Sequence, residues 1–296
     1  MNWTKGRDVL ALLLMACFGQ LSHAATTDTE WHALSGKPDL KSGSVLILDE
    51  TTSSVLYARQ ANLATPIASI TKLMTALVVL DSGQPLDEVV EVTQADRGSG
   101  KGAHSRLPVG AKLSRSDLLH LALMASENRA AHVLGRTYPG GLPAFVRAMN
   151  AKATVLHMNT AHFVDPSGLS SYNVASPVDL AKLVIAAAQN PTIRDFSTDN
   201  EHTVQIGRTA LEFHNTNSLV SNPTWDIIVQ KTGYISEAGR CLVLKAMIEG
   251  RAVVIVLLDS FGKYTRVADA KRIKTWMESA LQSSASNGAP AAVAGN

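Results

Sequence analysis

A serine and a lysine lie three residues apart in segment 66–76 of the sequence, at Ser69 and Lys72. The apolar residues that follow have the spacing of a helix with one buried face, and Ser69 lies at or near its start. One helical turn separates the two side chains, so the lysine amine can reach the serine hydroxyl. A serine beside an amine whose pKa is lowered by burial is a nucleophile with its own general base. The field at the start of the helix favours a developing oxyanion. The segment therefore predicts nucleophilic chemistry.

The spacing of these two residues is weak evidence by itself. The same Ser-x-x-Lys pattern recurs at Ser260 and Lys263. There, Gly262 and the turn-like context after an apolar strand argue against a helical pair. The case for Ser69 therefore depends on its partners.

Ser126 and Asn128 form a second candidate group at the junction of two helical stretches. A hydroxyl and an amide two residues apart on such a connection can point into one cleft. The serine could relay a proton, and the amide could donate to a substrate carbonyl. The alternative is local backbone capping, and the spacing recurs at Ser171 and Asn173.

A third group, Lys231-Thr232-Gly233, is predicted to end a strand that runs from Trp225. The lysine would provide a fixed positive charge and the threonine a hydroxyl for a substrate carboxylate. The glycine would leave room for a close backbone approach. The alternative is a strand end with a solvated lysine, and segment 41–43 repeats the pattern ahead of Ser69.

The pattern of elements predicts an α+β domain. The expected strands cover 44–49, 54–58, 88–92, 225–230, 241–248 and 252–258. The expected helices cover 118–125 with a cap at 116–117, 128–136, 143 to about 157, 177–188 and 267–281, and 97–110 reads as a loop. We expect the N-terminal and C-terminal strands to share one antiparallel sheet and the middle helices to form a second lobe. The active site would occupy the cleft between them.

The N-terminus has the features of a targeting segment. Lys5 and Arg7 precede a short apolar run, and Ser22-His23-Ala24 resembles a cleavage signal, so residues 1–24 are predicted to be a signal peptide. The run continues past Cys17 and has a methionine at position 15, which argues against lipidation there. We expect a leader at 25–42, a catalytic domain at 43–282 and a disordered tail at 283–296.

Composition and cysteine content exclude several classes of function. A formal net charge of +2 and the lack of a basic stripe argue against nucleic-acid binding. After cleavage Cys241 would be the sole cysteine, which we expect to be a buried strand residue without a disulfide. The nine histidines show no metal-binding spacing. We therefore predict neither a metal site nor a cofactor.

The order Ser-x-x-Lys, Ser-x-Asn, Lys-Thr-Gly resembles the three-part signature of penicillin-binding proteins and serine β-lactamases. More narrowly, the chain is similar to the low-molecular-mass penicillin-binding proteins, in particular the D-alanyl-D-alanine endopeptidase subgroup. The match covers roughly residues 43–280. It is carried by segments 68–76, 126–131, 138–141, 168–170, 215–220, 231–234, 238–243 and 261–264.

The resemblance implies a β-lactamase/transpeptidase-like fold and acyl transfer on D-alanyl peptides of peptidoglycan in the periplasm. Ser69 would attack the D-alanyl carbonyl, Lys72 would act as general base, and Ser126 would relay the proton to the leaving amine. The backbone N–H groups of Ser69 and Tyr234 would form the oxyanion hole.

The resemblance also assigns the binding residues. Asn128 would hold the substrate amide, Lys231 and Thr232 would stabilise charge, and Gly233 would allow close approach. Arg266 is a candidate for a carboxylate contact, with an ordinary surface arginine as the alternative. β-Lactam antibiotics would be covalent inhibitors, and a loose association with the cell wall or membrane is expected.

Three competing functions remain. A D,D-carboxypeptidase usually carries a further β-rich domain and a C-terminal amphipathic helix, which are not found in the roughly twenty residues after Trp276. A class A β-lactamase needs a glutamate between the second and third motifs, but Asp165 and Glu201 lack the expected surroundings. A catalytically silent sensor would not require the complete set of catalytic residues.

Overall fold

A single antiparallel sheet carries the segments from both ends of the domain. In the computed structural model, which describes residues 36–97 and 105–287, this sheet has five strands in the order β2-β1-β11-β10-β9. Their bounds are β1 (Ser42–Asp49), β2 (Ser54–Arg59), β9 (Asp226–Ile235), β10 (Gly239–Ile248) and β11 (Arg251–Ser260). β1 pairs with β11, for example Leu46 with Val256. The expected sharing of one sheet by N-terminal and C-terminal strands is confirmed.

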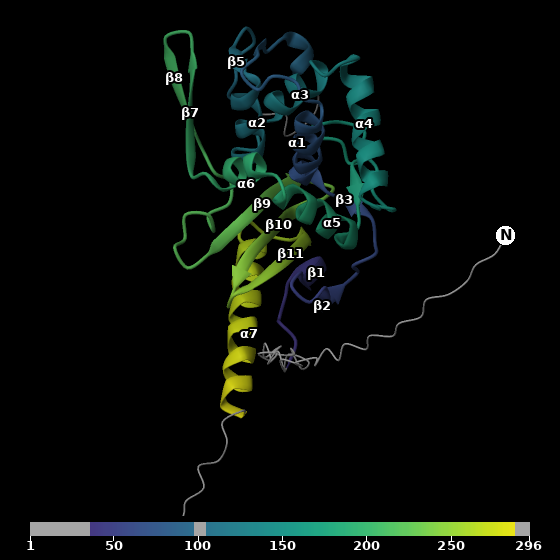
Figure 1. The fold of residues 1–296 in the computed structure, drawn as a ribbon, viewed down its shortest axis with the longest axis vertical. Coiled ribbons are helices and arrows are strands. Elements are labelled where there is room, and N and C mark those ends of the chain that lie inside the picture. The colour runs from purple at the N-terminus through teal and green to yellow at the C-terminus, as the bar shows by residue number, and fades with distance from the viewer. Residues whose placement is uncertain (1–35, 98–104, 288–296) are drawn as a thin grey trace, which may run out of the picture. The chain divides into compact units, whose positions relative to one another are not determined.

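Both faces of the sheet are covered, as the continuous apolar run in β11 requires. Residues Val253 to Leu258 are all fully buried, which an alternating, half-exposed strand would not show. Helix α5 (Pro177–Ala188) packs on one side, and helix α7 (Thr265–Asn287) packs on the other (Figure 1). Each fully buried Leu, Ile or Val side chain contributes roughly 1.5–3 kcal/mol to this core.

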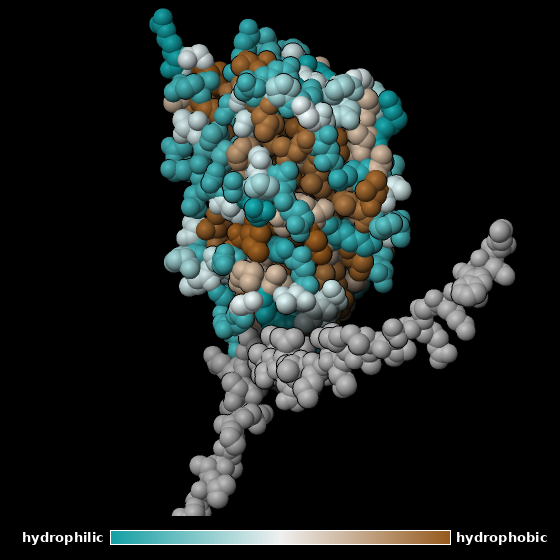
Figure 2. Space-filling model, viewed as in Figure 1, coloured by the Kyte–Doolittle hydropathy of each residue, from teal (hydrophilic) through white to brown (hydrophobic). Residues whose placement is uncertain are grey.

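The middle helices form the second lobe that the sequence predicts. They are α1 (Thr71–Asp81), α2 (Arg115–Met124), α3 (Asn128–Arg136), α4 (Gly141–Val155) and α6 (Pro191–Thr198). Buried side chains of α1 to α5 and of the facing side of the sheet make one continuous apolar cluster. Figure 2 shows that apolar residues also reach the viewed surface of the helical lobe, interspersed with hydrophilic ones.

Short strands and turns connect the lobes. The pairs are β3 (Thr65–Pro66) with β6 (Val174–Ala175), β4 (Val89–Glu91) with β5 (Lys112–Ser114), and β7 (Glu201–Ile206) with β8 (Thr209–His214). Two 3₁₀ turns, η1 (Ala68–Ile70) and η2 (Gln94–Asp96), complete the list. All these elements belong to one compact unit, residues 34–296.

Several sequence-based boundaries were wrong, each for a local reason. Helix α2 is capped by Ser114, whose side chain accepts from the backbone N–H of Asp117, rather than by Ser116-Asp117. Helix α4 begins at Gly141, ahead of Pro143. The stretch between α5 and β9, in which the sequence analysis places no element, contains a helix and a hairpin. Asn190 caps α6, and alternating residues form the β7–β8 hairpin.

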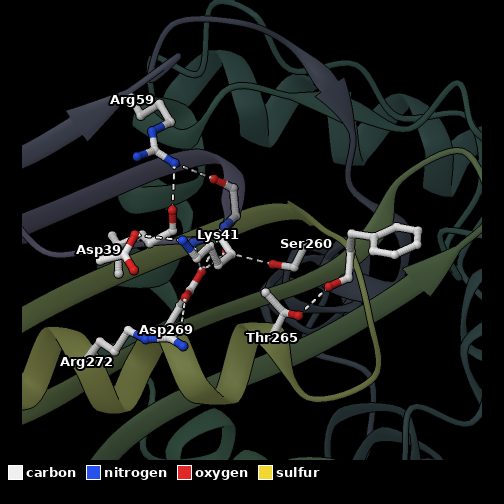
Figure 3. A network of polar contacts seen from close by, with 10 residues as sticks. Asp39, Lys41, Arg59, Ser260, Thr265, Asp269 and Arg272 are labelled. Carbon is white, nitrogen blue, oxygen red and sulfur yellow. Dashed lines mark hydrogen bonds and ion pairs between the residues drawn. The ribbon is translucent and has the colours of Figure 1, made fainter.

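The boundary of the folded domain lies before the predicted residue 43. Asp269 of α7 is fully buried and accepts hydrogen bonds from the backbone N–H groups of Lys41 and Ser42, at 3.0 and 2.8 Å (Figure 3). It also accepts from Ser42 Oγ at 2.7 Å. Lys41 and Ser42, which the sequence analysis assigned to the leader, are therefore bound to α7, and β1 begins at Ser42.

At the other end, α7 continues to Asn287, so residues 283–287 of the predicted tail are helical. The predicted signal peptide, Cys17, most of the leader, part of the 97–110 loop and the end of the tail lie outside the described residues. No helix among the described residues is long and apolar enough to cross a membrane.

Candidate active site

Ser69 lies in a strained backbone turn at the start of α1. The 3₁₀ turn η1 runs directly into α1, and Ala68 has a φ of 49°, which non-glycine residues rarely adopt. Two glycines make this turn possible. A Cβ on Gly168 would lie 1.9 Å from Ala68 O, and one on Gly233 would lie 3.1 Å from Ser69 N. Ser69, the predicted nucleophile, is thus held between the loop at Gly168 and strand β9.

The Lys72 amine connects two of the predicted groups and a loop that was not among them. Its Nζ lies 2.9 Å from Ser69 Oγ, 2.8 Å from Asn128 Oδ1 and 2.7 Å from Ser167 O. Two of these atoms accept hydrogen bonds, so a neutral amine can give each one hydrogen and direct its lone pair at the Ser69 hydroxyl. This is the arrangement that a general base requires.

Electrostatics favour that neutral amine. Lys72 is fully buried, and burial lowers its pKa from 10.5 to about 7. Asp165 and Glu127 oppose this shift and raise the pKa. At neutral pH a large fraction of Lys72 is therefore able to take a proton.

Asp165 organises the loop that faces Lys72, a role that the sequence analysis missed. Its Oδ1 accepts from Ser167 N, Ser167 Oγ and Gly168 N, each at 2.7 Å, and its Oδ2 accepts from Ser170 N at 3.0 Å. The Asp-Pro-Ser-Gly sequence at 165–168 is typical of a turn. It did not indicate that the turn would present Ser167 O to the lysine.

A buried asparagine supports the same loop. Asn173 donates to Asp165 O at 2.9 Å and to Thr71 Oγ1 at 3.1 Å, and its own Oδ1 accepts from Val164 N at 2.7 Å. Asn173 belongs to the repeated Ser-x-Asn spacing that we set aside. Its contacts are structural: it joins the 165–170 loop to Thr71, the first residue of α1.

Ser126 occupies the connection between α2 and α3, as predicted. Its φ of 59° lies in the left-handed region, so the backbone is strained at this point. The next residue, Glu127, caps α3 by accepting from Arg129 N at 3.3 Å, and Asn128 follows as the first residue of α3. The structure thus brings Asn128 to Lys72. Ser126 lies two residues before Asn128, on the connection between α2 and α3.

The Lys-Thr-Gly segment lies inside strand β9, two residues before its end, which corrects the prediction that it terminates the strand. Gly233 pairs with Cys241, and the ladder continues to Ile235. A glycine suits this position because the strand passes close to η1. β9 is an edge strand of the sheet. This edge position leaves the segment next to the nucleophile.

The side chains of this segment have partners that the sequence did not reveal. Lys231 is fully buried and donates to Thr232 O at 2.9 Å, so it is not a solvated lysine. Burial and the cations Lys72 and Arg266 lower the pKa of Lys231 well below the usual range. The site therefore disfavours a positive charge on Lys72 and Lys231 at the same time. The Thr232 hydroxyl lies 2.6 Å from that of Thr216.

Arg266 is not an ordinary surface arginine. Its Nη1 donates to Gly233 O at 2.7 Å and to Cys241 O at 3.0 Å, which ties α7 to β9 and β10. Tyr234 is 57% exposed and its ring lies under the Arg240 guanidinium, 4.5 Å from the centroid. The role predicted for Tyr234, in the oxyanion hole, uses its backbone N–H and not this exposed ring.

The remaining candidates have structural explanations. Ser260 ends β11 and its Oγ lies 2.7 Å from Ser42 Oγ, so Ser260 and Lys263 form no helical pair (Figure 3). Cys241 is buried in β10, as expected, and burial raises the pKa of its thiol to about 12. On the β7–β8 hairpin, Glu201, Glu212 and His214 lie close together, but all three are exposed, and His214 lies within 3.9 Å of Glu201 and 3.5 Å of Glu212.

Comparison with known proteins places this geometry in a family. The model of the peptidase S11 family, described as D-alanyl-D-alanine carboxypeptidase, matches residues 32–262. A D-alanyl-D-alanine endopeptidase of Pseudomonas aeruginosa is 47% identical over 272 residues, covering 90% of this chain and 88% of that protein. One of Escherichia coli is 45% identical over 271 residues, covering 91% and 86%.

Solved structures agree with the sequence relatives. The Streptomyces K15 DD-transpeptidase matches with a TM-score of 0.75 at 29% identity, over 82% of this chain and 99% of that one. The expected α+β fold with its active site between sheet and helical lobe is thereby confirmed. The chain belongs to the peptidase S11 family.

Proposed function

We propose that this protein is a serine D-alanyl-D-alanine endopeptidase that hydrolyses the D-Ala cross-links of peptidoglycan. The observation that carries the proposal is the Lys72 amine, which is buried, has a lowered pKa and lies 2.9 Å from Ser69 Oγ. The endopeptidase names of the two relatives above support the substrate class.

The proposed reaction has two steps. Lys72 takes the Ser69 hydroxyl proton as Oγ adds to the D-alanyl carbonyl carbon, and the N–H groups of Ser69 and Tyr234 stabilise the oxyanion. The C–N bond then breaks, and the leaving amine receives the proton through Ser126. Water hydrolyses the resulting ester on Ser69 and regenerates the hydroxyl.

The binding residues take the roles that their contacts support. Asn128 positions Lys72 and holds the substrate amide. Lys231 and Thr232 stabilise charge on the leaving side of the scissile bond, while Gly233 admits the close approach of β9. Arg266 supports that strand from behind, and we propose that it adds positive charge for a substrate carboxylate.

A second candidate is a D,D-carboxypeptidase, because the matching family model carries that description. β-Lactams should acylate Ser69 in either case, since the nucleophile is the same. We further propose export by residues 1–24, location in the periplasm, a catalytic domain that begins near residue 39, and loose association with the cell wall or membrane.

The test uses purified mature protein with isolated cross-linked muropeptide dimers and, separately, with pentapeptide monomers. Mass analysis should show dimers converted to monomers and pentapeptides left intact. Loss of one D-Ala from pentapeptides, with dimers intact, would establish the carboxypeptidase instead. No change in either substrate, with penicillin still bound, would contradict both and indicate a sensor.

A further inference from the structure

A cavity of about 520 Å³, lined mainly by polar and charged residues, adjoins the Lys-Thr-Gly segment of β9. Its wall includes Thr216, whose hydroxyl contacts that of Thr232, and Arg266, which donates to Gly233 O. The β7–β8 hairpin, the 215–221 loop, β10 and the start of α7 supply the rest of the lining. We refer to this cavity as the side pocket.

The side pocket is positively charged. Arg240, Lys263 and Arg266 line it, against the single carboxylate of Glu201, which already lies 3.9 Å from His214. Among the described residues, the side chains of Arg240 and Lys263 have no acidic partner and make no hydrogen bond. Each only lies over an aromatic ring, Arg240 on Tyr234 and Lys263 on Tyr264, at 4.5 and 5.3 Å. Two cations are thus available to a ligand.

Unpartnered donors in the wall point to the same kind of ligand. Asn217 is 2% exposed, and its Nδ2 has no hydrogen-bond partner. Arg266 Nε is also buried without a partner. Buried polar atoms are normally paired. Both atoms are donors, so the occupant that suits them supplies acceptors such as carboxylate or peptide carbonyl oxygens.

The position of the side pocket identifies which part of a substrate reaches it. Thr232 is proposed to stabilise charge on the leaving side of the scissile bond. Its hydroxyl contacts that of Thr216, which lines the side pocket, so the pocket lies next to this side of the site. A terminal D-Ala is too small to fill a cavity of this volume, which suits a much larger ligand. In a cross-link the leaving amine belongs to a second stem peptide, which carries carboxylates.

We infer that the side pocket binds the leaving stem peptide of a cross-linked substrate, and that Arg240 and Lys263 recognise a carboxylate on it. This inference rests on the proposed endopeptidase function and adds the specificity determinant to it. It gives a physical reason for preferring a dimer over a pentapeptide, because only the dimer leaves a peptide long enough to reach both cations.

The experiment compares two dimers that differ in the leaving peptide alone, one with free carboxylates and one with those carboxylates amidated. The enzymes are wild type, Lys263→Gln, and the double variant Arg240→Gln/Lys263→Gln. Lys271→Gln is the matched control, because Lys271 is an exposed lysine like Lys263 but lies on α7 and does not line the side pocket. Lys263→Arg tests whether retained charge restores cleavage.

For the dimer with free carboxylates, kcat/KM should fall roughly threefold in Lys263→Gln and about tenfold in the double variant. The kcat/KM of wild type should be about tenfold lower for the amidated dimer than for the dimer with free carboxylates. The kcat/KM of the double variant should differ little between the two dimers. Lys263→Arg should recover most of the activity, and Lys271→Gln should match wild type.

Equal cleavage of both dimers by wild type and double variant would overturn the assignment of the side pocket and leave the endopeptidase function intact. A wild-type enzyme that binds penicillin on Ser69 but cleaves neither dimer would overturn the endopeptidase function and this inference with it.

Discussion

The Nζ atom of Lys72 lies 2.9 Å from Ser69 Oγ, and the Lys72 side chain is fully buried. The same Nζ donates to Ser167 O, 95 residues further along the chain. The loop at 165–170 therefore determines where the lysine lone pair points. Catalysis in this account depends on a neutral, oriented amine as much as on the serine.

The first prediction concerns pH. Because burial lowers the pKa of Lys72 to about 7, the base form is lost below that value. The second-order rate constant for acylation by a fluorescent penicillin should fall about tenfold per pH unit below pH 7 and level off above about pH 8. A rate that does not change between about pH 5.5 and about pH 7 would contradict the assignment of Lys72 as base.

Asp165→Asn should move that profile. The Asp165 carboxylate raises the pKa of Lys72, so its neutralisation should lower the midpoint by roughly half to one unit. The amide keeps an acceptor oxygen for the Ser167 and Gly168 N–H groups. Asp226→Asn removes an exposed carboxylate at the start of β9 and should leave the midpoint unchanged. A midpoint that rises in Asp165→Asn would contradict the inference that the Asp165 carboxylate raises the pKa of Lys72.

Gly168→Ala should displace the nucleophile. Its φ of 80° is unfavourable to alanine, and the added Cβ would lie 1.9 Å from Ala68 O. We expect a loss of about 3 kcal/mol or more in the free energy of unfolding, measured with urea, together with slower acylation. Gly83→Ala is the matched control, because Gly83 has a φ of 65° but open space around it. It should cost only about 1 kcal/mol.

Asp269→Asn should destabilise the fold without touching the active site. The buried carboxylate accepts three hydrogen bonds from Lys41 and Ser42 and pairs with Arg272 at 2.7 Å (Figure 3). Loss of this charge should lower the free energy of unfolding by about 2–4 kcal/mol. Asp39→Asn, at an exposed ion pair, should show no measurable change. Equal stability of the two variants would mean that residues 39–42 do not belong to the folded domain.

The three motifs could be predicted from sequence because the residues of each motif lie close together in the chain. Ser69 and Lys72 share a helical turn, and the order of the motifs along the chain distinguishes them from the repeats at Ser260 and Ser171. The strand pattern at the two ends also indicated one sheet, since buried strands such as Val253 to Leu258 are apolar throughout.

The contacts between distant segments could not be predicted. Ser167 O reaches Lys72 and Thr216 reaches Thr232 only because the fold brings their loops together. The side pocket is likewise built from four separate segments. The β7–β8 hairpin was missed although Val204, Ile206, Leu211 and Phe213 alternate with polar residues, because the high polar content of the whole stretch concealed that period.

The most direct test of the central claim is the mass of the covalent adduct formed with penicillin and its position in the chain. Wild type should gain one penicilloyl group, and peptide mapping should locate it on Ser69. Ser69→Ala should gain none, although Ser260 and Ser126 remain. An adduct on any other residue, or an undiminished adduct in Ser69→Ala, would contradict the assignment of Ser69 as the nucleophile.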